Sequence, residues 1–218
     1  MDLKPEFIDY LKALVNGEME DLETFKAWWD EHYQDLKNSV PIWMLIRFEQ
    51  GGKLCAEVTL NELGISTNSD STEPDLSLDD PYEMLKSLKG AHYPQAFRRF
   101  SVFCAQAQSK WLCPEWLKGI EDANAFANDD ISETEWQSEC ERLTEHFWEI
   151  RESDAGEITA AKQAVLACFD PNPFCAAVTA STSSSASIFF ETGDEDCCAE
   201  EEARQVDVLR DEIARAKN

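Results

Sequence analysis

A helix-start signal followed by regularly spaced apolar residues constrains this chain most. Ser132-x-x-Glu135 is a capping box, in which a hydroxyl and a carboxylate satisfy the first free N–H groups of a helix. Five apolar residues then recur at intervals of four, three, four and three, as they do along one buried stripe of a helix. They are Trp136, Cys140, Leu143, Phe147 and Ile150. This pattern predicts an amphipathic helix that packs against others.

Similar signals recur through residues 81–218 and predict a C-terminal multi-helix bundle. Asp80-Pro81 is expected to cap and open its first helix, with Glu83 completing a capping box. Further helices are expected from Pro94, running on to Trp111, from Pro114 and over residues 157–169. These elements alternate with short polar connections, as expected for packed helices.

The last two predicted helices differ in composition. Asn172 and Pro173 are expected to cap and open a helix over residues 174–190, whose small side chains let neighbouring helices approach closely. A final helix over residues 197–216 carries Val206, Leu209 and Ile213 towards the core.

Residues 1–65 are predicted to form a small N-terminal helical unit. Helices are expected over residues 5–15 and 19–38, the second with Leu22, Phe25, Trp29 and Leu36 on one stripe, and an apolar central element over residues 42–46. Residues 53–60 fit either a short strand or a helix. Residues 66–80, rich in Ser, Thr and Asp, are predicted to link this unit to the bundle over residues 81–218. The expected fold class is therefore mainly α.

The charge of the chain restricts its partners. The sequence has 44 Asp and Glu against 19 Lys and Arg, a formal net charge of −25 over 218 residues. Such a field repels nucleic-acid phosphates and anionic lipids, so direct nucleic-acid and membrane binding are not expected. We expect a protein partner with a basic surface or an apolar groove. The absence of a signal peptide and of a long apolar run predicts a cytoplasmic protein.

Cysteines and histidines do not form a recognisable site in the sequence. The eight cysteines include no Cys-x-x-Cys pair and are interpreted as reduced, mostly buried thiols. The three histidines, His32, His92 and His146, are scattered, and neither a metal-ligand spacing nor a nucleophile turn surrounds any cysteine. We therefore expect no metal, no cofactor and no catalytic residues.

Two groups of residues are candidates for binding a partner. Trp28 and Trp29 are adjacent and cannot both face one core, and Trp43 stands in an all-apolar segment; packing between the N-terminal helices is the simpler interpretation. The second group is the acidic tract of residues 191–202; its simpler interpretation is a solvated loop before a helix whose dipole favours acids. The candidate partner-binding residues are Trp28, Trp43, Glu191, Asp194, Glu195 and Asp196.

Four segments of residues 93–213 form a recognisable set. They are Arg98-Arg99-Phe100-Ser101-Val102-Phe103-Cys104 with Trp111 after it, Ala123-x-x-Phe126-Ala127-Asn128-Asp129, the Ala-rich residues 160–180 and residues 205–211. With these segments, residues 93–213 resemble a family of uncharacterised alpha-helical proteins abundant in planctomycete bacteria. The double Cys and Arg-Arg that follow the first helix in that family are replaced here by Ala105-Gln106-Ala107-Gln108, and the family's Gly-Asn-Pro-Phe-like ending is missing. The resemblance implies a helical fold and transfers no catalytic residue.

Three hypotheses about function follow. The first is a non-enzymatic acidic protein–protein interaction module, acting as an adaptor, regulator or inhibitor, for example in a bacterial defence or stress complex. The second is a DNA mimic that blocks a nucleic-acid-binding protein, which requires ordered rows of carboxylates. The third is a carboxylate or metal enzyme of unrecognised type. The charge pattern favours the first.

Overall fold

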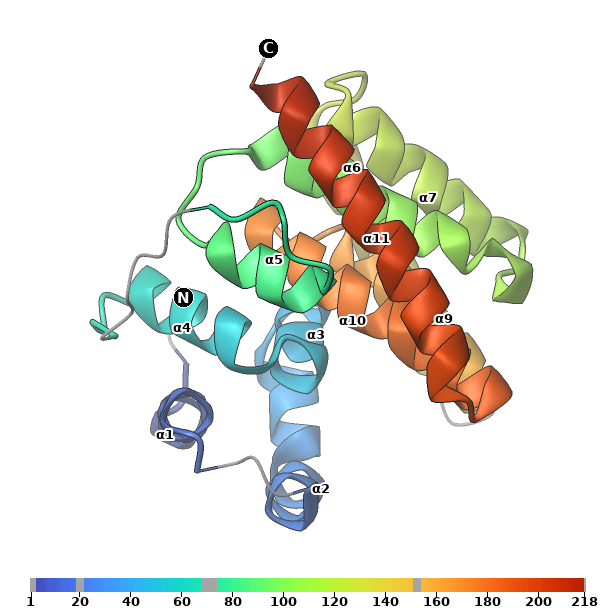
Figure 1. Ribbon diagram of the computed structural model, residues 1–218. Coiled ribbons are helices and arrows are strands. Elements are labelled where there is room, and N and C mark those ends of the chain that lie inside the picture. Colours follow the sequence, from blue (N-terminus) through green and yellow to red (C-terminus); the bar gives the residue numbers. More distant parts are fainter. Residues whose placement is uncertain (1–2, 19–21, 68–73, 151–153, 218) are drawn as a thin grey trace. The chain divides into compact units, whose positions relative to one another are not determined.

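The structure, a computed structural model, describes residues 3–18, 22–67, 74–150 and 154–217, without the side chains of residues 22, 25, 149 and 150. These residues form eleven α-helices and one short 3-10 helix and contain no strand (Figure 1). The prediction of a mainly α protein is confirmed. The chain divides into two compact units, Met1–Asp70 and Ser71–Asn218, each described by itself below.

The first unit consists of four helices. They are α1 (Pro5–Asn16), α2 (Leu22–Ser39), α3 (Ile42–Gln50) and α4 (Gly52–Glu62). Helix α4 packs along α1 and against α3, and together they bury a core that includes Phe7, Tyr10, Leu36, Met44 and Leu60. On the predicted stripe of α2, Leu36 is buried and Trp29 half-buried, whereas residues 19–21 and the side chains of Leu22 and Phe25 lie outside the described residues.

Residues 53–60, for which the sequence left strand and helix open, are helical. A sharp turn at Gly51 leads directly from α3 into α4, and a Cβ at Gly51 would lie only 2.6 Å from the carbonyl oxygen of Arg47 and 2.4 Å from Cβ of Cys55. Only glycine fits such a close approach. The buried Arg47 then joins the two helices, because it donates to Oγ1 of Thr59 (3.2 Å) and pairs with Glu62 (2.8 Å).

The second unit is a bundle built around α10. Its elements are α5 (Pro81–Ser87), α6 (Pro94–Ala107), η1 (Ser109–Trp111), α7 (Pro114–Ala127), α8 (Glu133–Ile150), α9 (Gly156–Ala167), α10 (Pro173–Thr192) and α11 (Glu195–Ala216). Helix α10 packs against α6, α9 and α11, while α7 and α8 pack on each other and on the α6–α9 side (Figure 1). No helix in the described residues of either unit has the length and apolar character that crossing a bilayer requires.

The three helix caps predicted in this unit, Asp80, Ser132 and Asn172, are confirmed. Oδ1 of Asp80 accepts a hydrogen bond from the backbone N–H of Glu83 (2.7 Å). Ser132 and Glu135 form the reciprocal capping box, with N–H of Ser132 donating to the Glu135 carboxylate (2.9 Å) and N–H of Glu135 donating to Oγ of Ser132 (3.3 Å). Oδ1 of Asn172 accepts from two backbone N–H groups at the start of α10. Each cap satisfies donors that the helix itself leaves free.

Several predicted boundaries in this unit change. Helix α10 continues to Thr192 instead of ending at residue 190, and α11 starts at Glu195 instead of residue 197, so Glu195 and Asp196 belong to its first turn rather than to a loop. The helix that starts at Pro94 ends at Ala107, so Trp111 lies in the separate turn η1 rather than on that helix. At the turn, Nε2 of the buried Gln108 donates to Oγ of Ser184 (2.7 Å), which anchors the chain on α10. The helix predicted over residues 157–169 ends at Ala167. Of the stripe on α8, Trp136, Leu143 and Phe147 are buried and Cys140 is half-buried, and the side chain of Ile150 lies outside the described residues.

Part of the predicted linker packs on the second unit. The division between units falls after Asp70, inside the predicted linker over residues 66–80. From Asp75 onwards the segment is held, because its N–H donates to Oγ of Ser87 (3.0 Å) and Nε of Arg210 donates to the carbonyl of Leu76 (2.9 Å). Residues 68–73 lie outside the described residues. The described C-terminal part of the segment therefore belongs to the packed bundle.

Helix α10 is buried on nearly all sides and uses small residues for this purpose. Several of its buried serine hydroxyls find partners on neighbouring helices, whereas the buried hydroxyl of Ser183 makes no hydrogen bond to the described residues. Oγ of Ser181 donates to the side chain of Gln205 (2.5 Å), and Oγ of Ser184 donates to the carboxylate of Glu201 (3.2 Å). A polar layer thus joins α10 to α11 inside the bundle and sets how the two helices align.

Candidate functional site

Two phenylalanines at the last turn of α10 are exposed. Phe189 is 47 % exposed and Phe190 is 58 % exposed, and their ring centroids lie 6.4 Å apart. Among the described residues the other large apolar side chain that is exposed is Tyr82, at 36 %. Adjacent exposed aromatic rings are a common feature of protein-binding surfaces.

The fold itself explains why these rings are exposed. Burial falls along α10: residues 174–181 are all buried, whereas Phe189, Phe190 and Glu191 are exposed. The helix ends at Gly193, whose φ of 63° lies in the left-handed region that glycine adopts readily. At the start of α9, a Cβ on Gly156 would lie 3.0 Å from the Phe190 ring, so one face of this ring rests on a residue without a side chain.

Charged groups follow the two rings closely along the chain: Glu191 comes directly after Phe190, and three acids come directly after Gly193. Nζ of Lys110 pairs with the Glu191 carboxylate (2.6 Å) and lies 4.9 Å from the centroid of the Trp111 ring. Across the Gly193 turn, Asp194 caps α11 by accepting a hydrogen bond from the N–H of Asp196 (2.9 Å), and Glu195 and Asp196 point into solvent.

We call this set the Phe189–Phe190 surface. It comprises Lys110, Trp111, Phe189, Phe190, Glu191, Asp194, Glu195 and Asp196. It carries four carboxylates and one ammonium group, so its field attracts cations.

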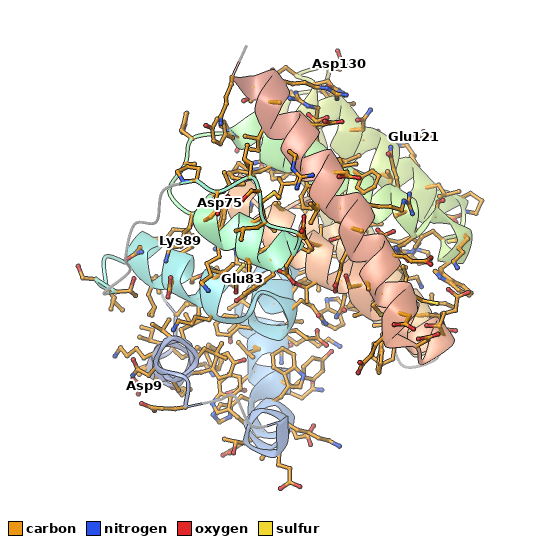
Figure 2. The ribbon with its side chains drawn as sticks, viewed as in Figure 1. Asp9, Asp75, Glu83, Lys89, Glu121 and Asp130 are labelled. Carbon is orange, nitrogen blue, oxygen red and sulfur yellow. The ribbon has the colours of Figure 1, made fainter. Side chains whose placement is uncertain are left out.

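Acidic side chains elsewhere in the chain mostly cover its exterior. Asp9 on α1, Glu121 on α7 and Asp130 after α7 point away from their helices in Figure 2 and are exposed. What distinguishes the Phe189–Phe190 surface is that two adjacent apolar rings, rather than one, are exposed next to carboxylates.

Of the residues that the sequence suggested, the four acids lie on this surface, whereas the two tryptophans lie in the other unit. Trp28 is half-buried and belongs to an aromatic cluster: its ring stacks on Tyr10 (3.8 Å between centroids) and meets Phe7 and His32 edge-on. Trp43 is half-buried beneath Arg47, whose guanidinium carbon lies 4.9 Å from the ring centroid. The contacts of Trp28 join α2 to α1 and match the simpler interpretation of packing between N-terminal helices, whereas the Trp43–Arg47 contact lies within α3.

Phe189 and Phe190 were not suggested by the sequence reasoning. Because α10 is apolar or small on every side, no periodicity marks one of its faces as exposed. The local signal was the Phe-Phe-Glu-Thr-Gly ending, where two large rings follow a run of small residues just before a helix stop.

Most of the cysteines are buried or half-buried. All eight cysteines are free; Cys55, Cys104, Cys168 and Cys175 are buried and Cys113 is exposed. Burial raises the pKa of both Cys140 and Cys168 to about 12, so these thiols stay protonated and unreactive. Within the described residues, no group of three or more His, Cys, Asp or Glu side chains is arranged to hold a metal ion.

The chain matches no protein-family model, no curated protein and no solved structure. The resemblance of residues 93–213 to helical planctomycete proteins therefore stays a prediction.

Proposed function

We propose that this protein is an acidic protein–protein interaction module that acts by binding and uses the Phe189–Phe190 surface. The observation that carries the proposal is the exposure of two adjacent phenylalanines beside four carboxylates. The complementary partner segment presents apolar side chains with Lys or Arg next to them. Covering each exposed ring would contribute roughly 1–2 kcal/mol to binding, by the area it still exposes to water.

The two kinds of side chain have different roles in such a complex. The rings supply affinity, since apolar anchors near the centre of an interface dominate its energy. The carboxylates orient the partner and raise the association rate, because acidic groups in a chain of net charge −25 steer a basic partner during its approach. Adaptor, regulator and inhibitor roles all use this chemistry.

The ion pairs of the second unit favour this proposal over DNA mimicry. Several of its carboxylates already pair with arginines of the same helix: Glu139 with Arg142 (2.5 Å), Glu201 with Arg204 (2.9 Å) and Glu212 with Arg215 (2.5 Å). A mimic of duplex DNA needs rows of uncompensated charge at about one per 1.7 Å. These three carboxylates are also buried, so they present no row of charge to a DNA-binding protein.

The proposal is tested with short amphipathic peptides and three forms of the full chain. The probes are peptides in which Leu or Phe stands between Lys residues, with matched peptides in which Ser replaces the apolar residues or Glu replaces Lys. We expect saturable binding of the basic apolar peptides to the wild type, measured by fluorescence anisotropy. The double variant Phe189→Ser/Phe190→Ser should bind them at least ~10-fold more weakly, which corresponds to about 1.4 kcal/mol.

The variant Tyr82→Ser is the matched control, because Tyr82 is the other exposed large apolar side chain among the described residues. It should bind as the wild type does. Equal affinity of all three proteins would show that net charge alone attracts the peptides and would overturn the proposed site. The lack of any saturable binding by basic apolar peptides would overturn the proposed function.

A further inference from the structure

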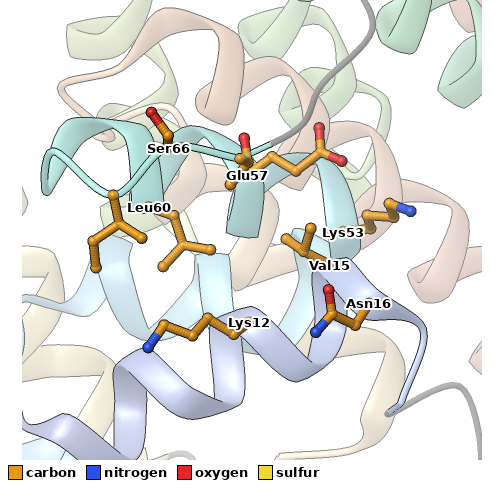
Figure 3. A pocket seen from close by; sticks show the side chains of 9 residues that line it. Lys12, Val15, Asn16, Lys53, Glu57, Leu60 and Ser66 are labelled. Carbon is orange, nitrogen blue, oxygen red and sulfur yellow. The ribbon is translucent and has the colours of Figure 1, made fainter.

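A concave site lies on the first unit, apart from the Phe189–Phe190 surface. It is a pocket of ≈ 400 Å³ between α1 and α4. Its walls include Lys12, Val15, Lys53, Glu57, Leu60 and Ile65 (Figure 3). This volume falls in the range in which proteins bind small organic molecules.

The end of α4 completes the pocket. At Gly64, with φ of 75° in the left-handed region, the chain reverses direction, and the N–H of Ile65 donates to the carbonyl of Leu60 (2.9 Å). The following Thr67 is tied back by its N–H and its hydroxyl, which both reach Oδ1 of Asn61 (3.4 Å). Ile65 is thereby held beside Leu60 as an apolar wall.

Two ammonium groups flank this apolar wall in a chain that is otherwise strongly acidic. In Figure 3 Lys12 lies at one end of the pocket, near Leu60, and Lys53 lies at the other, near Asn16. Lys12 contacts Asp9 at 3.3 Å, but both side chains are at least half exposed, so this pair is weak and exchangeable. Glu57, only 6 % exposed, adds one carboxylate on the Lys53 side.

We infer that this pocket binds a small organic monocarboxylate with a short aliphatic body. The carboxylate head pairs with the lysine ammonium group at one end of the pocket, and the body lies on Val15, Leu60 and Ile65. Inorganic phosphate has no apolar body to cover these side chains, so the site discriminates against it. The site is independent of the proposed partner surface, which lies in the other unit.

Titration of the ¹⁵N-labelled full chain with hexanoate tests this inference. We expect saturable chemical-shift changes at Val15, Leu60 and Ile65. Hexan-1-ol, which lacks the charge, and inorganic phosphate, which lacks the body, should each bind at least ~5-fold more weakly than hexanoate.

Variants with matched controls assign the role of the lysines. Lys12→Gln/Lys53→Gln should weaken hexanoate binding at least ~5-fold, and Lys12→Arg/Lys53→Arg should retain it within about twofold, because the charge is kept. Lys26→Gln makes the same kind of charge change on α2, away from the pocket lining, and should leave binding unchanged. The inference is overturned if hexanoate gives no saturable shifts, if phosphate binds as tightly, or if K26Q and the double Gln variant behave alike.

Discussion

The aromatic residues of the two units differ in what covers them. In the first unit, Phe7, Tyr10, Trp28 and Phe48 form one cluster in which each ring contacts another, and Tyr10 stacks on both Trp28 (3.8 Å) and Phe48 (5.6 Å). In the second unit, Phe189 and Phe190 contact each other and remain about half exposed. The cluster holds a small unit together, whereas the exposed pair adds little to stability and is available for binding.

The largest expected effect separates these two roles. Tyr10→Ala should lower the free energy of unfolding of the first unit by about 3–5 kcal/mol, because it empties a fully buried aromatic position. Phe190→Ala should change the stability of the second unit by less than about 0.5 kcal/mol. Urea unfolding followed by tryptophan fluorescence and circular dichroism measures both. A large loss of stability for F190A would contradict the distinction between cluster and surface.

A smaller effect on stability is expected when only the hydroxyl of Tyr10 is removed from the covered aromatic cluster. The hydroxyl of Tyr10 donates to the carbonyl of Phe48 (3.1 Å), so Tyr10→Phe should cost about 1 kcal/mol at neutral pH. Burial, and next the charge of Glu49, raises the pKa of Tyr10 above its ordinary value. The unfolded chain therefore loses this proton first, and the stability that the neutral phenol contributes is complete below about pH 10 and decreases above it.

Comparison of the wild type with Y10F at two pH values isolates the contribution of the Tyr10 hydroxyl to this pH dependence. The stability difference between wild type and Y10F, measured by urea unfolding at pH 8 and at pH 11, should shrink or change sign at the higher pH. An unchanged difference would mean that the Tyr10 hydroxyl is accessible to water in the native state.

The position of the Phe190 ring can be changed by a substitution at a neighbouring residue, Gly156. Gly156→Ala places a methyl group 3.0 Å from the Phe190 ring, which must then shift. We expect the affinity for basic apolar peptides to fall about threefold, with stability changed by less than about 0.5 kcal/mol. A double-mutant cycle with Phe190→Ala checks the cause, since G156A should have no further effect on binding once the ring is absent. If the losses of affinity in the two single variants instead add up in the double variant, G156A weakens binding through a group other than the Phe190 ring.

The smallest expected effect on binding concerns Lys110, the cation of the Phe189–Phe190 surface. Lys110→Gln breaks an exposed ion pair with Glu191 and removes the one cation of the surface, so stability should change by less than about 0.5 kcal/mol. The affinity for basic peptides should rise about twofold at low salt, and the gain should vanish at high salt. Lys118→Gln, which breaks the exposed Lys118–Asp122 pair on α7, is the control for net charge. An equal gain in both variants would exclude a specific role of Lys110.

Much of the fold could be predicted because its signals are local. Caps such as Asp80, Ser132 and Asn172 act within three residues, so the sequence places them correctly without knowing the tertiary structure. The helix end at Ala107 was missed because the turn after it is held by a distant partner, Ser184. Likewise, whether residues 53–60 form a strand or a helix depended on how closely two helices approach at Gly51.

The candidate site could be predicted only in its charged half. The acids at residues 191 and 194–196 are visible as a tract, but exposure of an aromatic ring depends on which helices surround it. Trp28 and Phe190 are both large apolar residues at helical positions, and nothing local distinguishes the packed ring from the exposed one. The pocket was also missed, because its lysines are 41 residues apart in the sequence, at positions 12 and 53.

By itself, the sequence determined the helical class, most helix starts and the strongly acidic exterior, because periodicity, capping and net charge require only neighbours along the chain. The tertiary structure decided which aromatic rings are covered and which lysines share a pocket. Both depend on helix packing, which brings together residues far apart in the sequence and leaves the last turn of α10 exposed.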